Sequence, residues 1–246
     1  MSRIVSWFSC GATSAVATHL TLEKYKGKKI EIIYTDTGSE HPDNHRFLKD
    51  CEKWFGQEIK ILKSDKYKDI WDVFEKTRYL VGVGGARCTT ELKKKLRFQY
   101  QKPDDLQIFG FDKSEQKRFD RFKKNNFDVN IEAPLIERGI SKSECLGFLE
   151  NQGIEIPFMY KLGYKNANCV PCVKGQQGYW NKIRKDFPDV FDRMAKVERK
   201  LNVAINKSYA GDGTRKRVFL DELNQNAGRY DEEISIECGV LCDMQE

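Results

Sequence analysis

Residues 3–22, with the sequence RIVSWFSCGATSAVATHLTL, constrain the fold more than any other stretch of the chain. Their apolar run at residues 4–8 has the length and the β-branched and aromatic residues of a buried strand. Small residues follow, and a helical pattern begins at Ala15. Such a strand–turn–helix unit offers an anion free backbone N–H groups and the positive end of the helix dipole. We therefore predict a phosphate-binding turn that consists of Ser9, Cys10, Gly11, Ala12, Thr13 and Ser14.

The spacing within this turn excludes two familiar phosphate-binding motifs. Neither G-x-x-x-x-G-K-S/T, which marks P-loop NTPases, nor the dinucleotide motif G-x-G-x-x-G is present. The turn instead resembles the pyrophosphate loop (PP-loop) of the adenine-nucleotide α-hydrolase superfamily, in the S-x-G-x-x-S form of the phosphoadenosine phosphosulfate (PAPS) reductase family. Ser9, Gly11 and Ser14 match this form, whereas Cys10 and Thr13 depart from the stricter S-G-G-x-D-S form.

Strand-like and helix-like segments alternate after this turn. Strands are predicted at residues 29–34, 58–62, 106–109 and 129–133, and helices at 43–55, 67–80, 88–100 and around 115–122. This alternation predicts right-handed βαβ units and a parallel, Rossmann-like sheet flanked by helices, an α/β fold. We expect a nucleotide-binding domain over residues 1–140 and a helical, cysteine-bearing extension over residues 141–246.

Patterns in this extension are weaker. A capping box, Ser141-x-x-Glu144, predicts the start of its first helix. Further helices are predicted at residues 179–185 and 189–201. From residue 202 on, we expect irregular structure with one short helix near 218–223.

The composition is that of a well-solvated globular chain. Hydrophobic residues make up 39% of the sequence, and no apolar run approaches the length that a bilayer requires. The first strand begins so close to residue 1 that we expect no signal peptide. Eight cysteines without a secretion signal favour reduced thiols for metal or redox chemistry over a disulfide framework. These features predict a cytoplasmic protein.

A net charge of +6 favours anionic partners. Basic residues are concentrated at 93–97, 117–124 and 215–217, whereas residues 231–246 are acidic. Each basic stretch fits either a solvated surface or a contact with a nucleic acid, so tRNA and DNA are candidate partners.

Cys169 and Cys172 form a C-x-x-C motif in a loop between two predicted helices. Thioredoxin-type pairs follow a strand and open a helix, whereas Pro171 in this loop favours a turn that directs both sulfur atoms to a metal. A closed site needs four ligands. Candidates for the remaining ones are Cys88, Cys238 and Cys242.

Further elements extend the resemblance to the PAPS reductase family over most of the chain. They are CTTELK at residues 88–93, the C-x-x-C motif, Gly110-Phe111 with Glu115 and Arg118, PLIERGI at residues 134–140, and ECG at residues 237–239. Two features depart from the family. Cluster-bearing reductases have Cys-Cys where this chain has Cys88-Thr89, and their tail reads E-C-G-x-H where this chain continues to Cys242.

The resemblance implies a set of site residues. An adenine nucleotide would rest its phosphates on residues 9–14, with Asp36, Gly110 and Phe111 flanking adenine and ribose. Lys93 and Arg118 would balance the remaining negative charge. A 4Fe–4S cluster would be held by Cys88, Cys169, Cys172 and Cys238, with Cys242 as the reactive thiol. The roles of Cys238 and Cys242 are interchangeable at this point, and zinc fits the ligand count equally well.

Three functions are compatible with these residues. The leading one is reduction of a PAPS-like sulfonucleotide with a thiol reductant, in which a thiolate attacks sulfur. The second is an ATP- and magnesium-dependent sulfurtransferase that adenylates a nucleic-acid base and delivers sulfur to it. The third is a non-catalytic nucleotide- or nucleic-acid-binding module with a structural zinc knuckle.

Overall fold

The computed structural model describes residues 3–209 and 213–236. Its central feature is a five-stranded sheet in the order β3-β2-β1-β6-β7, in which every pairing is parallel. The predicted α/β class is thus confirmed. The middle strand, IVSWF, is buried along its whole length, as its mainly apolar sequence favours, and its one polar side chain, Ser6, bonds to Thr18. The strands are β1 (Ile4–Phe8), β2 (Ile30–Thr35), β3 (Ile59–Leu62), β6 (Leu106–Ile108) and β7 (Asn130–Glu132).

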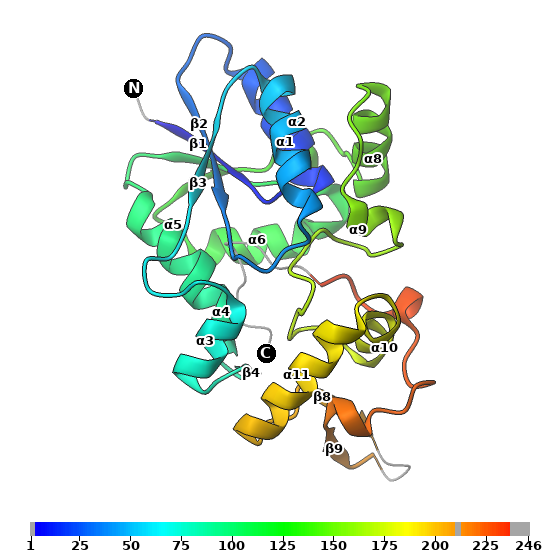
Figure 1. Cartoon of the computed structure of the whole chain (residues 1–246). Coiled ribbons are helices and arrows are strands. Elements are labelled where there is room, and N and C mark those ends of the chain that lie inside the picture. Colours follow the sequence, from blue (N-terminus) through cyan, green and yellow to red (C-terminus); the bar gives the residue numbers. More distant parts are fainter. Residues whose placement is uncertain (1–2, 210–212, 237–246) are drawn as a thin grey trace.

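Helices cover both faces of the sheet (Figure 1). One face packs against α1, α2 and α8 in a core that includes Val16, Phe47 and Leu149. The other face packs against α6, where Phe122 joins Trp7 in a second core. The predicted capping box is present at the start of α8. The helices of this half are α1 (Ala12–Lys24), α2 (Asp43–Phe55), α6 (Gln116–Asn125), α7 (Pro134–Glu137) and α8 (Lys142–Asn151).

A third core lies beyond the carboxyl edge of the sheet, in the lower half of Figure 1. It is built around the fully buried Trp180 and combines residues near 70–92 with residues after 158. Pro188 separates the two predicted helices of this half and opens the second one. The helices here are α3 (Ile70–Thr77), α4 (Arg87–Thr89), a π-helical segment (Thr90–Lys94), α9 (Phe158–Lys161), α10 (Gln177–Asp186) and α11 (Pro188–Leu201). The π-helical segment leads into α5 (Lys95–Tyr100), whose Tyr100 packs against the second core of the sheet.

The expectation of irregular structure after residue 202 is wrong in part. The strands β8 (Asn206–Tyr209) and β9 (Arg215–Val218) form an antiparallel hairpin. Basic residues occupy both of its strands, so the alternation of apolar and polar residues that signals a strand is missing. The short helix expected near residues 218–223 is a 3-10 turn at Leu220–Glu222. Residues 81–86, which include three glycines, contain two short strands, β4 (Val81–Gly82) and β5 (Gly85–Ala86).

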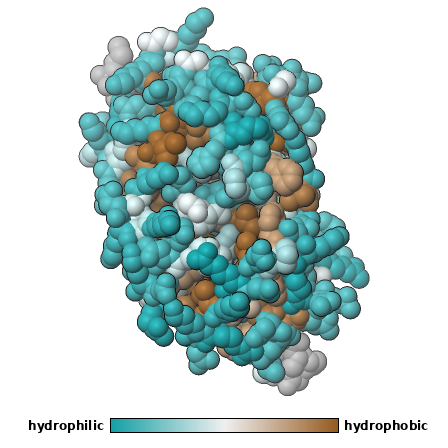
Figure 2. Space-filling model, in the orientation of Figure 1, coloured by the Kyte–Doolittle hydropathy of each residue, from teal (hydrophilic) through white to brown (hydrophobic). Residues whose placement is uncertain are grey.

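The surface agrees with a solvated chain. Figure 2 shows a largely hydrophilic face on which hydrophobic residues form separate patches. Among the described residues, no helix is both long enough and apolar enough to cross a membrane.

Candidate functional site

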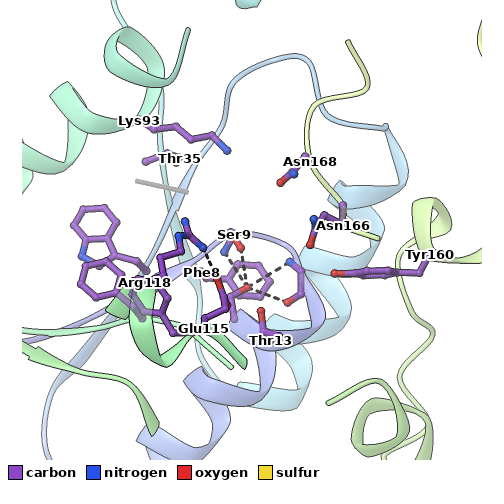
Figure 3. Close-up of a pocket in the computed structure, with 17 residues that line it drawn as sticks. Phe8, Ser9, Thr13, Thr35, Lys93, Glu115, Arg118, Tyr160, Asn166 and Asn168 are labelled. Atoms are coloured by element: carbon purple, nitrogen blue, oxygen red, sulfur yellow. Dashed lines mark hydrogen bonds and ion pairs between the residues drawn. The ribbon is translucent and has the colours of Figure 1, made fainter. Parts of the chain in front are cut away.

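An open pocket with about 750 Å³ of empty space lies at the carboxyl ends of β1 and β6. Ligands bind at this edge in open parallel sheets. Figure 3 shows the polar side chains that reach into it from several elements. The lining residues from the sheet and its turns are Trp7, Phe8, Ser9, Gly11, Thr13, Ser14, Thr35, Phe109, Gly110 and Phe111, and the others are Lys93, Glu115, Arg118, Tyr160, Asn166, Ala167 and Asn168.

The Ser14 hydroxyl holds the predicted phosphate turn in shape. Its Oγ accepts hydrogen bonds from the backbone N–H of Ser9 at 3.0 Å and of Gly11 at 3.3 Å, and it donates to the Gly11 carbonyl at 2.9 Å. Gly11 is the residue before α1, so the helix N-terminus faces the pocket. Hydrogen bonds of the Ser14 side chain therefore organise the strand–turn–helix unit that the sequence predicts.

Cys10 belongs to this turn but does not line the pocket. Its backbone has a φ of +57°, and its fully buried side chain contacts the Asn44 carbonyl oxygen at 3.7 Å. Burial raises the pKa of the Cys10 thiol well above its ordinary value. A protonated, buried thiol is a packing group rather than a nucleophile. Ala12 is buried as well, and it contributes its backbone N–H.

Tyr160 reaches this turn from α9, which the sequence did not indicate. Its hydroxyl oxygen accepts a hydrogen bond from the Ala12 N–H at 3.3 Å, and Figure 3 shows its ring pointing at the turn. The hydroxyl thus contacts one of the first N–H groups of α1, where a phosphate would be bound. The aromatic and lysine-rich stretch around Tyr160 has no periodicity, so no sequence signal marked this residue.

Both cations that line the pocket face a carboxylate. Lys93 comes from the π-helical segment, is buried, and has its Nζ 3.8 Å from Glu40. Arg118 forms an ion pair with Glu115 on the other side of the pocket. The pocket therefore has two cations, but each one is already balanced by a neighbouring acid.

Asp36 lies behind the pocket wall rather than in it. Its carboxylate accepts a hydrogen bond from the Gly38 N–H at 2.8 Å and forms an ion pair with Lys63 at 2.9 Å. Burial acts to raise the pKa of Asp36, but Lys63 and the Gly38 N–H outweigh it and lower the pKa. The preceding residue, Thr35, is the one that lines the pocket. A direct role of Asp36 in nucleotide binding stays a prediction.

The loop that contains the C-x-x-C motif is attached to the end of β2. The Val170 N–H donates to the Ser39 carbonyl at 3.0 Å, and Cys169 pairs with Glu40 in an isolated antiparallel bridge. The hydroxyl of Thr37 lies 3.0 Å from the Cys169 sulfur. Since residues 35–40 follow a strand whose end borders the pocket, these bonds place the cysteine loop directly beside the phosphate turn.

Cys169 and Cys172 are buried and share the lining of a second, smaller pocket. Cys88 packs against the same hydrophobic core from α4. Within residues 3–209 and 213–236, no three His, Cys, Asp or Glu side chains are arranged to hold a metal ion. Cys238 and Cys242 lie outside the described residues. The ligand set of the cysteine site thus stays a prediction.

The last described residues lie over this loop. The Ile236 carbonyl accepts hydrogen bonds from the side-chain amides of Asn166 at 2.9 Å and Asn168 at 2.5 Å. Nearby, Glu233 accepts from two N–H groups at the start of α10, and burial raises its pKa. Asn166 and Asn168 also line the nucleotide-sized pocket. Ile236, the last described residue, therefore contacts the two asparagines that line the pocket, and it lines the smaller pocket together with Cys169 and Cys172.

Comparison with known proteins assigns a family to the part of the chain that contains the phosphate turn and the C-x-x-C motif. The family model for the phosphoadenosine phosphosulfate reductase domain matches residues 3–175. The chain belongs to the PAPS reductase domain family. The matched residues of this PAPS reductase domain include the turn, both cations of the pocket and the C-x-x-C motif.

Known relatives of this PAPS reductase domain are distant. An uncharacterized protein of Methanocaldococcus jannaschii is 26% identical over 223 residues, which cover 85% of this chain but 44% of that protein. An uncharacterized nin region protein of Escherichia phage lambda is 25% identical over 245 residues, covering 88% of this chain and 78% of that protein. The chain thus spans less than half the length of the first relative.

One solved structure supports the fold, and a second shows a weaker likeness. PAPS reductase from Candida auris, in a phosphate complex, superposes with a TM-score of 0.53 at 13% identity, covering 69% of this chain and 82% of that chain. The U34-tRNA thiolase NcsA from Methanococcus maripaludis, with its 4Fe–4S cluster, gives a TM-score of 0.46 at 14% identity, covering 82% of this chain and 73% of that one.

Proposed function

We propose that this chain binds an adenine nucleotide in the pocket and carries out sulfur chemistry on it with the adjacent cysteines. One observation supports this most strongly: a single loop serves both sites. Asn166 and Asn168 line the pocket, while Cys169, the next residue, lines the cysteine site. A nucleotide bound at the turn would thus present its phosphate side to the thiols.

Each lining residue has a role in this proposal. The N-terminus of α1 and the hydroxyls of Ser9 and Thr13 would bind the phosphate nearest the sheet. Lys93 and Arg118 would hold the outer anionic groups, because both reach the pocket from outside the turn. Gly110 lets the backbone after β6 approach α1 closely.

The cysteine site contains the type of ligand, the thiolate, that iron–sulfur clusters and zinc prefer. Cys88, Cys169 and Cys172 would hold a 4Fe–4S cluster or zinc together with Cys238, since thiolates are preferred by both. Arg87 and Lys93 lie on the same short helical stretch as Cys88 and would reduce the repulsion among thiolates. When bound, the group would offset part of the negative charge of the thiolates beside the reacting end of the nucleotide.

The reaction that we assign first is reduction of a sulfonucleotide. The Cys242 thiolate would attack the sulfur, the S–O bond would break, and its electron pair would leave on the phosphate oxygen. One thiol of a dithiol donor would then attack the Cys242 sulfur, release sulfite and form a mixed disulfide with Cys242. The second thiol of the donor would attack the donor sulfur of that disulfide, which frees the Cys242 thiolate and leaves the donor as a disulfide. Ser9 and Thr13 would hold the leaving phosphate during the first step.

Sulfite release from a sulfonucleotide in the presence of a dithiol tests this assignment. We expect Cys242→Ser to abolish release while nucleotide binding is retained. Cys51→Ala is the matched control, because Cys51 lies on the buried face of α2 and burial raises the pKa of its thiol. No sulfite from the wild-type chain, or full activity of Cys242→Ser, would reject this reaction.

The charge balance of the pocket supports a second candidate, the ATP-dependent sulfuration of a nucleic-acid base. Because Lys93 and Arg118 each face a carboxylate, the pocket offers little excess positive charge to a highly anionic sulfonucleotide. ATP would bring Mg²⁺, which neutralises its phosphates. Pyrophosphate release from ATP that requires both Mg²⁺ and an added nucleic acid would establish this reaction, and its absence with either tRNA or DNA would exclude it.

A further inference from the structure

Two phenylalanines are unusually exposed on one side of the molecule. Phe127 is 89% exposed and Phe98 is 55% exposed, whereas most aromatic side chains of the chain are packed in the cores. Phe98 lies on α5, and Phe127 follows the end of α6. A single exposed ring is ordinary on a protein surface, so the surroundings that these two rings share decide what they can do.

A bridging arginine brings the two elements together. Arg97, next to Phe98, is buried and donates a hydrogen bond to the Asn126 side chain at 3.0 Å, next to Phe127. The Arg97 guanidinium also lies over the ring of Phe122 on α6, 5.4 Å from its centroid. Phe98 and Phe127 are therefore held on adjoining elements of one continuous surface.

The helix α6, which ends two residues before Phe127, is rich in cations. Residues 117–124 contain five basic residues and one acidic residue. Arg121, Lys123 and Lys124 are exposed, and in the described part of the chain no ion pair joins any of them to a carboxylate. We name the surface formed by Phe98, Arg121, Lys123, Lys124 and Phe127 the α5–α6 edge.

We propose that the α5–α6 edge binds an unpaired stretch of RNA. Exposed aromatic rings stack on bases, and neighbouring lysines and arginines contact the phosphates between them. A duplex hides the faces of its bases, so this pairing of rings and cations selects a single strand. RNA is the appropriate nucleic acid because its loops and ends present unstacked bases, which are the usual targets of aromatic side chains.

The α5–α6 edge and the pocket share two elements. The π-helical segment that supplies Lys93 leads into α5, and the helix that carries Lys123 supplies Arg118 near its start. Phe127 follows the other end of this helix, shortly before β7 begins, so the edge and the pocket lie toward opposite ends of the shared elements. The proposal goes beyond the proposed function. If correct, it favours the second candidate reaction over the first, but it is tested by binding alone.

The test is fluorescence anisotropy with the full chain, no added nucleotide, and a labelled RNA strand of about 16 nucleotides, the upper end of the usual site size. We expect tighter binding to this strand than to the same sequence as a duplex, and at least as tight as to the DNA strand. Phe98→Ala and Phe127→Ala should each weaken binding about five-fold or more. Phe127→Trp should retain it, because indole also stacks on bases.

Salt dependence supplies the matched control. Lys123→Gln with Lys124→Gln should reduce the slope of log affinity against log salt by about 1.4, or about 0.7 for each lost phosphate contact. Arg215→Gln with Lys216→Gln makes the same charge change on exposed residues of the β8–β9 hairpin and should leave the slope unchanged.

Equal effects of the two pairs, wild-type binding by both alanine variants, or preference for duplex or DNA would overturn the proposal. Since nucleotide binding is not measured, failure here leaves the proposed function intact.

Discussion

The two halves of the molecule are held together by different kinds of contact. In the sheet half, parallel strands and apolar helix faces build two cores, and polar side chains such as Trp7 and Gln107 bond between adjacent strands. In the other half, buried side chains bond to distant backbone groups. Glu198, for example, accepts from the N–H groups of Ile205 and Leu220, both at 2.6 Å. The strands and helices of the sheet half can be predicted from local sequence patterns. The hydrogen bonds that hold the other half involve partners that only the fold brings together.

The strongest test of this contrast is to remove the centre of the third core. Trp180 is fully buried, so Trp180→Ala should lower the free energy of unfolding by about 3–5 kcal/mol. Phe47→Ala is the matched change in the sheet half, since Phe47 is also fully buried. Urea unfolding followed by tryptophan fluorescence and by circular dichroism measures both.

We expect each variant to unfold in one transition that the two probes report alike. The chain leaves the sheet after β3, builds α3 and α4 in the other half, and returns to β6, so neither half is one continuous segment. If Trp180→Ala instead shows a separate early transition, the two halves unfold independently, and the difference between them is a difference between two domains.

The next largest effect is a pH dependence from Glu198. Burial raises the pKa of this carboxyl to about 7, although its two backbone hydrogen bonds act to lower it. Since this pKa lies above that of the unfolded chain, the folded protein binds the proton more tightly, and the resulting stabilisation is lost as the pH rises toward 7. Between about pH 5 and pH 7.5, the free energy of unfolding should fall by about 2–3 kcal/mol from this group.

Glu198→Gln isolates this contribution, because glutamine does not titrate. The difference in unfolding free energy between wild type and variant, measured at both pH values, should change by the amount given above. A constant difference would show that Glu198 keeps an ordinary pKa in the fold, and that the backbone hydrogen bonds rather than burial dominate its state.

The same contrast explains which parts of the site could be predicted. Ser9, Gly11 and Ser14 occur in one local pattern, and the structure places all three at the pocket. Tyr160 and Asn168 reach the same pocket from a stretch without periodicity, through bonds to Ala12 and Ile236 that no local rule encodes. The family resemblance implies that Asp36 flanks the nucleotide. In the structure its carboxylate bonds to Lys63 and Gly38, contacts that the sequence pattern does not indicate, and its role at the nucleotide stays a prediction. The hairpin of β8 and β9 was missed because charge replaced the usual alternation.

A third prediction concerns the close approach between β6 and α1. A Cβ atom at Gly110 would lie 2.7 Å from the Ser14 Cα and 2.8 Å from its backbone nitrogen. Backbone atoms cannot move aside cheaply, so Gly110→Ala should destabilise the fold by about 1–3 kcal/mol and displace the phosphate turn. Isothermal titration with an adenine nucleotide should show loss of binding. Gly147→Ala on α8, where a Cβ meets no atom within 4 Å, is the control that should bind normally.

The smallest expected effect tests the contact that joins the halves. Thr37→Val removes the hydroxyl that donates to Glu40 and contacts the Cys169 sulfur. Thr18→Val removes a buried hydroxyl that donates to the Ser14 carbonyl inside the sheet half. Each loss should cost about 1 kcal/mol. Hydrogen exchange distinguishes them: only Thr37→Val should speed exchange of the Val170 amide beyond its global destabilisation, because that amide fastens the cysteine loop to Ser39. If both variants change this amide equally, the Thr37 contact does not hold the loop, and the cysteines are positioned by the third core alone.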